Sequence, residues 1–146
     1  LTRLVRELLE HAHDGRLKLY VTHRLLRYRR DHRDLFSKGE YLPLDPVGSK
    51  REHLCAFGRA IDGDACLVVV PRLVVTLAEG AERLPIGDGV WGDTWLPLAH
   101  ETVGRRYRNV LTGEVLEVQQ RRGGPGLAIA DILRHATVAC LERLTE

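Results

Sequence analysis

Two tryptophans and an aspartate lie close together in the segment Val90-Trp91-Gly92-Asp93-Thr94-Trp95. Tryptophan rings are good platforms for the faces of sugar rings, and an aspartate between them can accept hydrogen bonds from sugar hydroxyl groups. Trp91, Asp93 and Trp95 are therefore candidate substrate-binding residues for a carbohydrate. The alternative, which we favour, is that one tryptophan anchors a sandwich core while the other covers a sheet edge.

Side chains suited to catalysis are present but form no recognisable active site. Ser37 and Ser49 both lie in turn-rich connections, with no nucleophile elbow around either. Acids such as Asp62, Asp64 and Asp88 occupy turns, where aspartate is favoured for local hydrogen bonding. A glycosidase-type pair of carboxylates needs only to be close in space, so sequence spacing cannot identify one. We therefore predict no self-contained set of catalytic residues.

Motifs for cofactors and metals are incomplete. The glycine-rich segments 87–89 and 123–126 lack the strand and helix that flank nucleotide-binding loops, so we expect turns at both. His11 and His13 have a spacing that metal sites use, but no third ligand lies nearby in the sequence. We expect neither a cofactor nor a metal.

Three cysteines, Cys55, Cys66 and Cys140, form no C-x-x-C pair. This pattern predicts buried free thiols in a reducing compartment. The longest apolar run is far shorter than the roughly 18–20 residues that cross a bilayer, and the chain does not open like a signal peptide. We therefore expect a cytoplasmic protein without a membrane partner.

The charge of the chain is nearly balanced. Its 146 residues include 22 basic and 20 acidic side chains, which gives a formal net charge of +2. Binding to nucleic acid needs clustered positive charge, so this balance does not support it. Basic residues are densest at Arg24, Arg27, Arg29, Arg30 and Arg33, but this spacing distributes them around most of a helix. We expect a solvated helix face and no nucleic-acid partner.

Helical periodicity is confined to the first part of the chain. Apolar residues at i, i+3, i+4, i+7 and i+8 from Leu1 predict a helix that ends near Gly15. A second apolar stripe predicts another amphipathic helix within residues 17–36. Turn-forming residues follow Ser37 and mark a boundary. The stripes of these two helices must pack on the rest of this chain or on a domain that is not part of it.

The remaining residues predict short strands separated by turns. The clearest is a hairpin of strands 53–60 and 65–70 around the Asp62-Gly63-Asp64 turn. Further strands are expected at 94–99, 106–111, 114–119 and 136–141, with a helical turn at 131–133, whereas 72–79 fits a short helix or a strand. The fold class is therefore α+β, with two N-terminal helices followed by an antiparallel β-sandwich.

The chain contains no methionine, so we expect it to be a piece of a longer polypeptide. Several motifs, in order and spacing, then resemble the maltooligosyltrehalose synthase family of the α-amylase-type glycoside hydrolases. These motifs are Asp14-Gly15-Arg16-Leu17-Lys18-Leu19, Leu35-Phe36-x-x-Gly39-x-Tyr41-x-Pro43-Leu44, His53-Leu54-Cys55-Ala56-Phe57-Gly58-Arg59, Val68-Val69-Val70-Pro71-Arg72-Leu73, Trp91-Gly92-Asp93-Thr94 and Asn109-Val110-Leu111-Thr112-Gly113-Glu114. The likeness covers nearly the whole chain.

The resemblance implies a division of the chain and a role for it. Residues 1–36 would be the end of a catalytic barrel, and residues 37–146 a C-terminal antiparallel β-domain. Such enzymes convert the reducing-end α-1,4 bond of a maltodextrin into an α,α-1,1 bond, an isomerisation that belongs to trehalose biosynthesis. Their catalytic carboxylates would lie upstream of Leu1, so this portion would be inactive by itself.

The resemblance also implies partners. They are the upstream catalytic barrel of the same polypeptide and the maltooligosaccharide substrate of the whole enzyme, and the isolated fragment could self-associate through its apolar stripe. Lys18 is a further candidate near the substrate side of the barrel, although a solvated helix lysine is the favoured explanation. Two alternatives stay open: a stand-alone carbohydrate-binding module, and the C-terminal domain of another amylase-type enzyme.

Overall fold

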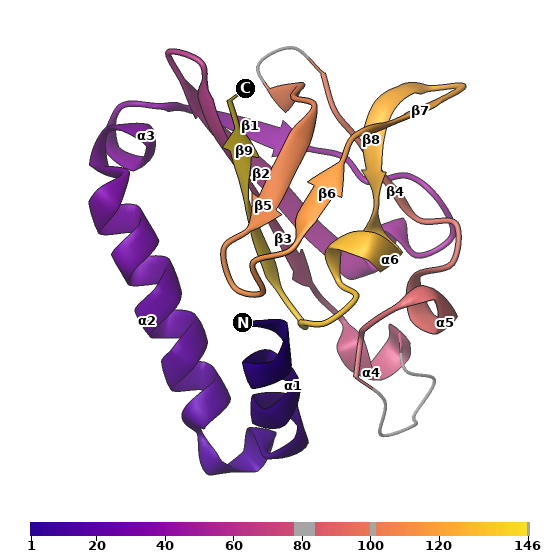
Figure 1. The fold of residues 1–146 in the computed structure, drawn as a ribbon. Coiled ribbons are helices and arrows are strands. Elements are labelled where there is room, and N and C mark those ends of the chain that lie inside the picture. The colour runs from indigo at the N-terminus through magenta and orange to yellow at the C-terminus, as the bar shows by residue number, and fades with distance from the viewer. Residues whose placement is uncertain (78–83, 100–101, 146) are drawn as a thin grey trace.

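The computed structural model describes residues 1–77, 84–99 and 102–145. Helices at the N-terminal end lie beside two antiparallel β-sheets (Figure 1). The helices are α1 (Thr2–Glu10), the 3-10 turn η1 (Ala12–Asp14), α2 (Arg16–Asp31), α3 (Arg33–Ser37), the 3-10 turn η2 (Arg51–His53), α4 (Val74–Leu77), α5 (Asp88–Trp91) and α6 (Ile129–Ile132). The strands are β1 (Glu40–Leu44), β2 (Leu54–Ile61), β3 (Asp64–Pro71), β4 (Trp95–Pro97), β5 (Arg106–Asn109), β6 (Val115–Glu117), β7 (Gln119–Arg121), β8 (Gly124–Ala128) and β9 (Ala139–Leu144). The predicted α+β class is thus confirmed.

Both helices predicted at the start of the chain are present. Gly15 joins them in the left-handed conformation (φ 83°), which a residue without a Cβ adopts at no steric cost. The second helix is interrupted at His32, whose non-helical backbone divides it into α2 and α3. No helix in the described ranges has both the length and the apolar character needed to cross a membrane.

The larger sheet has six antiparallel strands in the order β1-β2-β3-β9-β5-β6. The predicted hairpin of β2 and β3 is confirmed, and positive φ angles at Asp62 and Gly63 close its tight turn. The sequence predicts no strand among the turn-forming residues after Ser37, yet β1 lies there and pairs along its length with β2. Pro43 is tolerated there because β1 is an edge strand and needs no donor on its free side.

The smaller sheet has three strands in the order β4-β8-β7. The expected turn at residues 123–126 is wrong in part, since β8 begins at Gly124 and pairs with β4 through Gly126. Gly126 suits this place because Trp95 of β4 packs against it: a Cβ there would lie 2.6 Å from two atoms of the Trp95 ring. The segment 72–79 contains the short helix α4, and residues 78 and 79 lie outside the described residues.

Two hydrophobic cores use opposite faces of the six-stranded sheet. The first core lies between the two sheets and includes Leu67, Val69 and Leu141 together with α5 and α6. The second lies between that sheet and the helices α2 and α3, and includes Tyr28, Leu35 and buried side chains of β3 and β9. The helices therefore pack on the sheet over part of their surface.

The cysteines are free thiols, but they differ in burial. Cys66 and Cys140 are buried in the second core, as predicted. Cys55 is exposed, so the prediction of its burial is wrong. The reason is the alternation of β2, in which Leu54 and Ala56 face the first core and the residue between them faces away from it.

Candidate functional site

Trp91 is located in the first core. Its side chain has no exposed surface, and its indole N–H donates a hydrogen bond to the carbonyl oxygen of Pro85 at 2.9 Å. The last turn of α5 directs the ring inward between the two sheets. Trp91 therefore presents no ring face for a sugar in this structure.

Trp95 is nearly as well covered, at 5% exposure. Its backbone exchanges two hydrogen bonds of 2.8 Å with Val47, which fixes the strand to the preceding loop. The guanidinium group of Arg121, on β7, lies 4.0 Å from the centre of the Trp95 ring. This cation–π contact covers one face of the ring.

Asp93 is the exposed member of the three. One carboxylate oxygen accepts hydrogen bonds from the hydroxyl group (2.6 Å) and the backbone N–H (3.0 Å) of Ser49. These bonds favour the ionised form and hold the pKa of Asp93 below its usual value. The carboxylate therefore ties the 46–50 loop to the start of β4.

Lys18 is exposed on α2. This helix and α5 pack against opposite faces of the six-stranded sheet (Figure 1). In the described part of the chain Lys18 has no hydrogen-bond or ion-pair partner. The structure thus places Trp91, Trp95 and Asp93 in neighbouring but differently directed positions, and leaves Lys18 away from all three.

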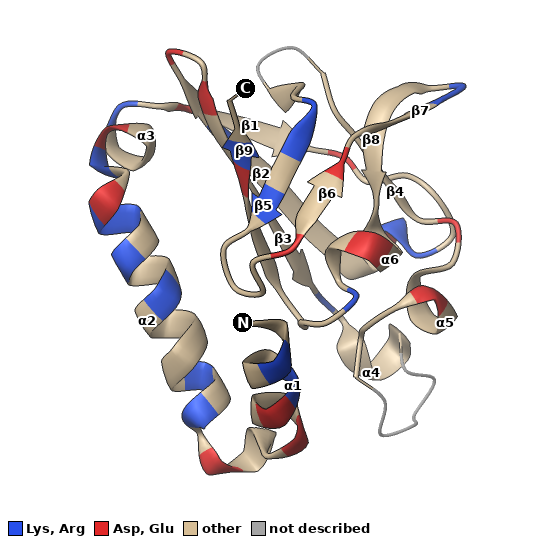
Figure 2. Ribbon diagram, viewed as in Figure 1, with Lys and Arg blue, Asp and Glu red and all other residues tan. Residues whose placement is uncertain are grey.

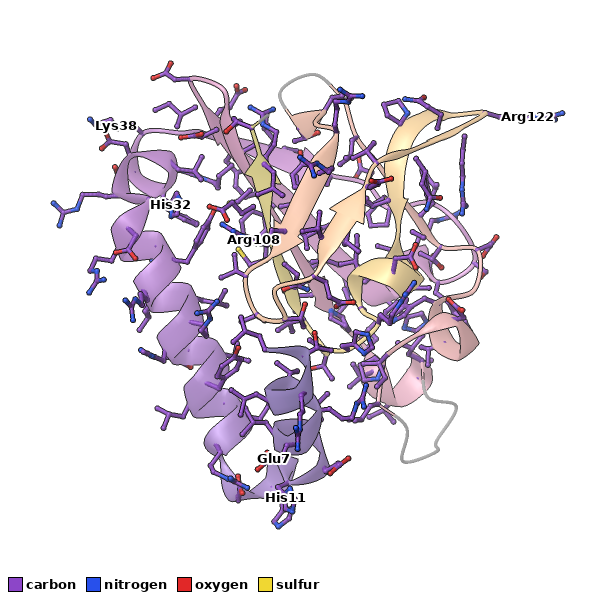
Figure 3. All side chains as sticks on the ribbon, in the orientation of Figure 1. Glu7, His11, His32, Lys38, Arg108 and Arg122 are labelled. Atoms are coloured by element: carbon purple, nitrogen blue, oxygen red, sulfur yellow. The ribbon has the colours of Figure 1, made fainter. Side chains whose placement is uncertain are left out.

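A cluster of charged side chains that the sequence did not indicate joins α2 to the sheet. The Glu142 carboxylate of β9 lies 2.5 Å from the Arg108 guanidinium of β5 and 3.2 Å from Nε2 of His32. Figure 3 shows His32 on the side of the helix that faces the strands. Its Nδ1 lies 3.0 Å from the carbonyl oxygen of Tyr28, so both ring nitrogens face acceptors.

The Tyr28 side chain lies beside this cluster and is buried, with 7% of its surface exposed. Its ring packs against His32 and Phe36, and its hydroxyl group has no hydrogen-bond partner in the described ranges. Burial raises the pKa of this phenol, and the contact with Cys66 together with burial raises the pKa of the Cys140 thiol. Both groups are therefore held in their neutral forms, which suits an apolar core.

A groove of about 430 Å³ opens between α2 and the face of the six-stranded sheet that carries the second core. Four aromatic residues line it, although the whole chain has only two phenylalanines and four tyrosines. They are Tyr28, Phe36, Tyr41 and Phe57, and the last two stack with centroids 5.3 Å apart. The lining is mainly apolar, with Arg29 and Arg59 at its polar positions.

Fold and site together define an α+β module whose described residues contain no group of three possible metal ligands. Its best-formed features are contact surfaces and packed clusters rather than a set of reactive side chains. No protein-family model matches the chain.

Known proteins nevertheless resemble it. Proteins from two strains of Mycobacterium tuberculosis that carry the name maltooligosyl trehalose synthase are 39% identical over 79 residues, which is 52% of this chain and 10% of theirs. A mutant form of maltooligosyltrehalose synthase from Arthrobacter ramosus matches 96% of this chain and 16% of its own, with a TM-score of 0.65 and 27% identity. The predicted resemblance to maltooligosyltrehalose synthase is confirmed. The chain spans about a tenth of the length of the curated relatives it matches.

Proposed function

We propose that this chain is the C-terminal, non-catalytic portion of a maltooligosyltrehalose synthase. The observation that carries the proposal is the structural likeness to the Arthrobacter ramosus enzyme, which extends over 96% of this chain at 27% identity. That likeness covers 16% of the enzyme, so we assign the catalytic carboxylates to the rest of such a protein.

The whole enzyme would convert the reducing-end α-1,4 bond of a maltodextrin into an α,α-1,1 bond. In the retaining mechanism of its enzyme class, one carboxylate forms a glycosyl intermediate and a second acts as acid and then as base. The reaction moves a glucosyl group within one molecule, so the enzyme would be an isomerase of trehalose biosynthesis. We place it in the cytoplasm, with maltooligosaccharide as its substrate and neither nucleic acid nor membrane as a partner.

Residues 1–36 would complete the catalytic barrel, and residues 37–146 would form the C-terminal β-domain. Hydrogen bonds between the two segments would then fasten the domain to the barrel. The Tyr20 hydroxyl group donates to the carbonyl oxygen of Leu111 at 2.6 Å, and Arg24 donates to that of Val110 at 2.6 Å. Arg59 donates in the opposite direction, to the carbonyl oxygen of Phe36 at 2.7 Å.

The test is a chimera in which this chain replaces the matching segment of the Arthrobacter ramosus enzyme. We expect the chimera to form trehalose-terminated products from maltoheptaose, and this chain by itself to form none. Activity of the isolated chain, or a folded chimera without activity, would contradict the proposal. A chimera lacking residues 37–146 controls for activity that does not need the β-domain.

A titration separates this proposal from the carbohydrate-binding module. Because Trp91 and Trp95 are buried, we expect tryptophan fluorescence of the isolated chain to stay constant up to millimolar maltoheptaose. Saturable quenching that is lost on Asp93→Ala substitution would favour the module.

A further inference from the structure

The two buried cysteines face the same core from neighbouring strands. Cys66 of β3 and Cys140 of β9 both belong to the second core, with 0% and 3% of their surface exposed. The pairing of the strands places Cys66 opposite Glu142, which follows Cys140 by two positions on β9. The two cysteines are therefore diagonal neighbours on one face of the sheet, where side chains are within reach of each other.

The two thiol groups are in contact. The Cys140 thiol donates a hydrogen bond to the Cys66 sulfur, and this bond lowers the pKa of Cys66 in spite of its burial. Arg59 acts in the same direction, whereas Glu142 opposes it. The covering helix α2 adds positive charge, with six basic residues and a single acid (Figure 2). Positive surroundings favour the thiolate, which is the reactive form of a cysteine.

A small molecule can reach this pair through the aromatic groove. Cys140 is among the residues that line this hollow of about 430 Å³. A water molecule occupies about 30 Å³ in the liquid, and hydrogen peroxide is larger by a single oxygen atom. The groove therefore has room for a peroxide molecule beside the pair.

We propose that Cys66 and Cys140 are a peroxide-sensitive dithiol that closes reversibly to a disulfide between β3 and β9. One thiol takes an oxygen atom from hydrogen peroxide, becomes a sulfenic acid and releases water. The second sulfur then forms the S–S bond and displaces the sulfenic oxygen, which leaves with the thiol proton as a second water molecule. Two sulfur atoms are oxidised, and the two oxygen atoms of the peroxide are reduced.

The strand register makes the closure reversible. Diagonal neighbours on a sheet face have Cα atoms about 7–8 Å apart, whereas most disulfides span about 4.4–6.8 Å. The two strands must therefore draw together to form the bond, and the resulting strain makes the bond easy to reduce. Labile disulfides of this kind are the ones that serve as redox sensors in reducing compartments.

The bond would act on the whole six-stranded sheet. In the order β1-β2-β3-β9-β5-β6, the pairing of β3 with β9 joins one group of three strands to the other. Cys66 and Cys140 are also far apart in the sequence, so the bond closes a long loop and restricts the unfolded chain. Oxidation should therefore make the chain more resistant to unfolding. This effect lies within the present chain and does not depend on the proposed function.

The experiment uses the Cys55→Ser chain, because the exposed Cys55 could link two molecules. The folded chain is treated with hydrogen peroxide and its intact mass is measured. A disulfide removes two hydrogen atoms, so we expect a loss of about 2 Da that excess reduced glutathione restores. A gain of about 16 Da or its multiples, without that loss, shows oxygen addition alone and overturns the proposal.

Digestion with trypsin locates the bond. Cleavage after arginine places Cys66 on peptide 60–72 and Cys140 on peptide 135–143. We expect the two peptides to be joined after peroxide treatment and to separate on reduction. The matched control is Cys55→Ser/Cys140→Ser, which keeps the size of the core and should show no loss of mass. The measurement on the Cys55→Ser chain decides the question whether or not this control folds.

Urea unfolding measures the effect on stability. We expect the oxidised chain to unfold at a higher urea concentration than the reduced chain, and glutathione to abolish the difference. An unchanged midpoint would overturn the role of the bond in holding the sheet together. The chain unfolded in urea shows that the peroxide oxidises accessible thiols. A folded chain that keeps both thiols under the same treatment would overturn the dithiol itself.

Discussion

Replacing Gly126 by alanine should destabilise the small sheet, because the added methyl group has no space. It would lie 2.6 Å from Cε2 and Nε1 of Trp95, where ordinary contacts begin at 3.4 Å. It would also meet the carbonyl oxygen of Leu96, which is backbone and cannot rotate away. Relief of this overlap, about 0.8 Å at the ring, requires β4 and β8 to separate or Trp95 to leave its site.

The size of the effect follows from two opposing contributions. Overpacking costs about 1–3 kcal/mol, and we take the upper end because one obstacle is backbone. Alanine also restricts the unfolded chain, which offsets roughly 0.5 kcal/mol. The expected loss is therefore about 2.5 kcal/mol in the free energy of unfolding. For a chain of this size that lowers Tm by roughly 8 °C.

Thermal unfolding followed by tryptophan fluorescence measures this loss. Gly123→Ala is the matched control, because a Cβ at Gly123 has no atom within 4 Å. We expect that control to change Tm by no more than a few degrees. Equal Tm values for the two variants would refute the argument that Trp95 packs directly on the backbone of β8.

Further predictions concern charge and pH. Glu142→Gln should cost about 1–2 kcal/mol in urea unfolding, because it breaks a partly exposed cluster, whereas Glu117→Gln on an exposed strand should be silent. Ser49→Ala should raise the pKa of Asp93 toward its usual value, which an NMR titration would measure. Because the pKa of Asp93 is depressed in the folded chain, the stability from its contact with Ser49 is present above pH 3.8 and is lost as pH falls. Burial raises the pKa of Tyr107 from 10.0 to about 12. The stability that its neutral phenol contributes is therefore complete below pH 10 and is lost as pH rises toward 12. Alkaline denaturation monitored by absorbance would show this loss.

The elements that could be predicted from the sequence are those with a strong period or an unambiguous turn. The N-terminal helices have apolar residues at helical spacing. The strands β2 and β3 are joined at Asp62-Gly63, a two-residue turn that is typical of a hairpin. The break at His32 and the edge strand β1 have no such pattern. Pro43 and Gly126 conventionally indicate turns, yet pairing across a sheet accommodates both.

The candidate site was harder to predict, because burial and pairing are properties of the folded chain. The spacing of Trp91 and Trp95 is the same whether their rings face solvent or a core, and tertiary packing places both inside. The cluster of His32, Arg108 and Glu142 joins residues more than thirty positions apart, so no local pattern could indicate it. The member of the cluster with a distinctive position along the chain is His32, which separates α2 from α3.

The two cores on opposite faces of one sheet also restrict how that sheet can pair. Along β3, Cys66 faces the helices, Leu67 faces the other sheet, and this alternation continues through the strand. A shift of one residue against β9 would exchange the two sets, placing leucines against α2 and thiols between the sheets. Neither space would be filled correctly, because the two sets differ in volume. The difference in side-chain size between the faces thus favours one alignment of the central strands, the same alignment that places Glu142 of β9 beside His32.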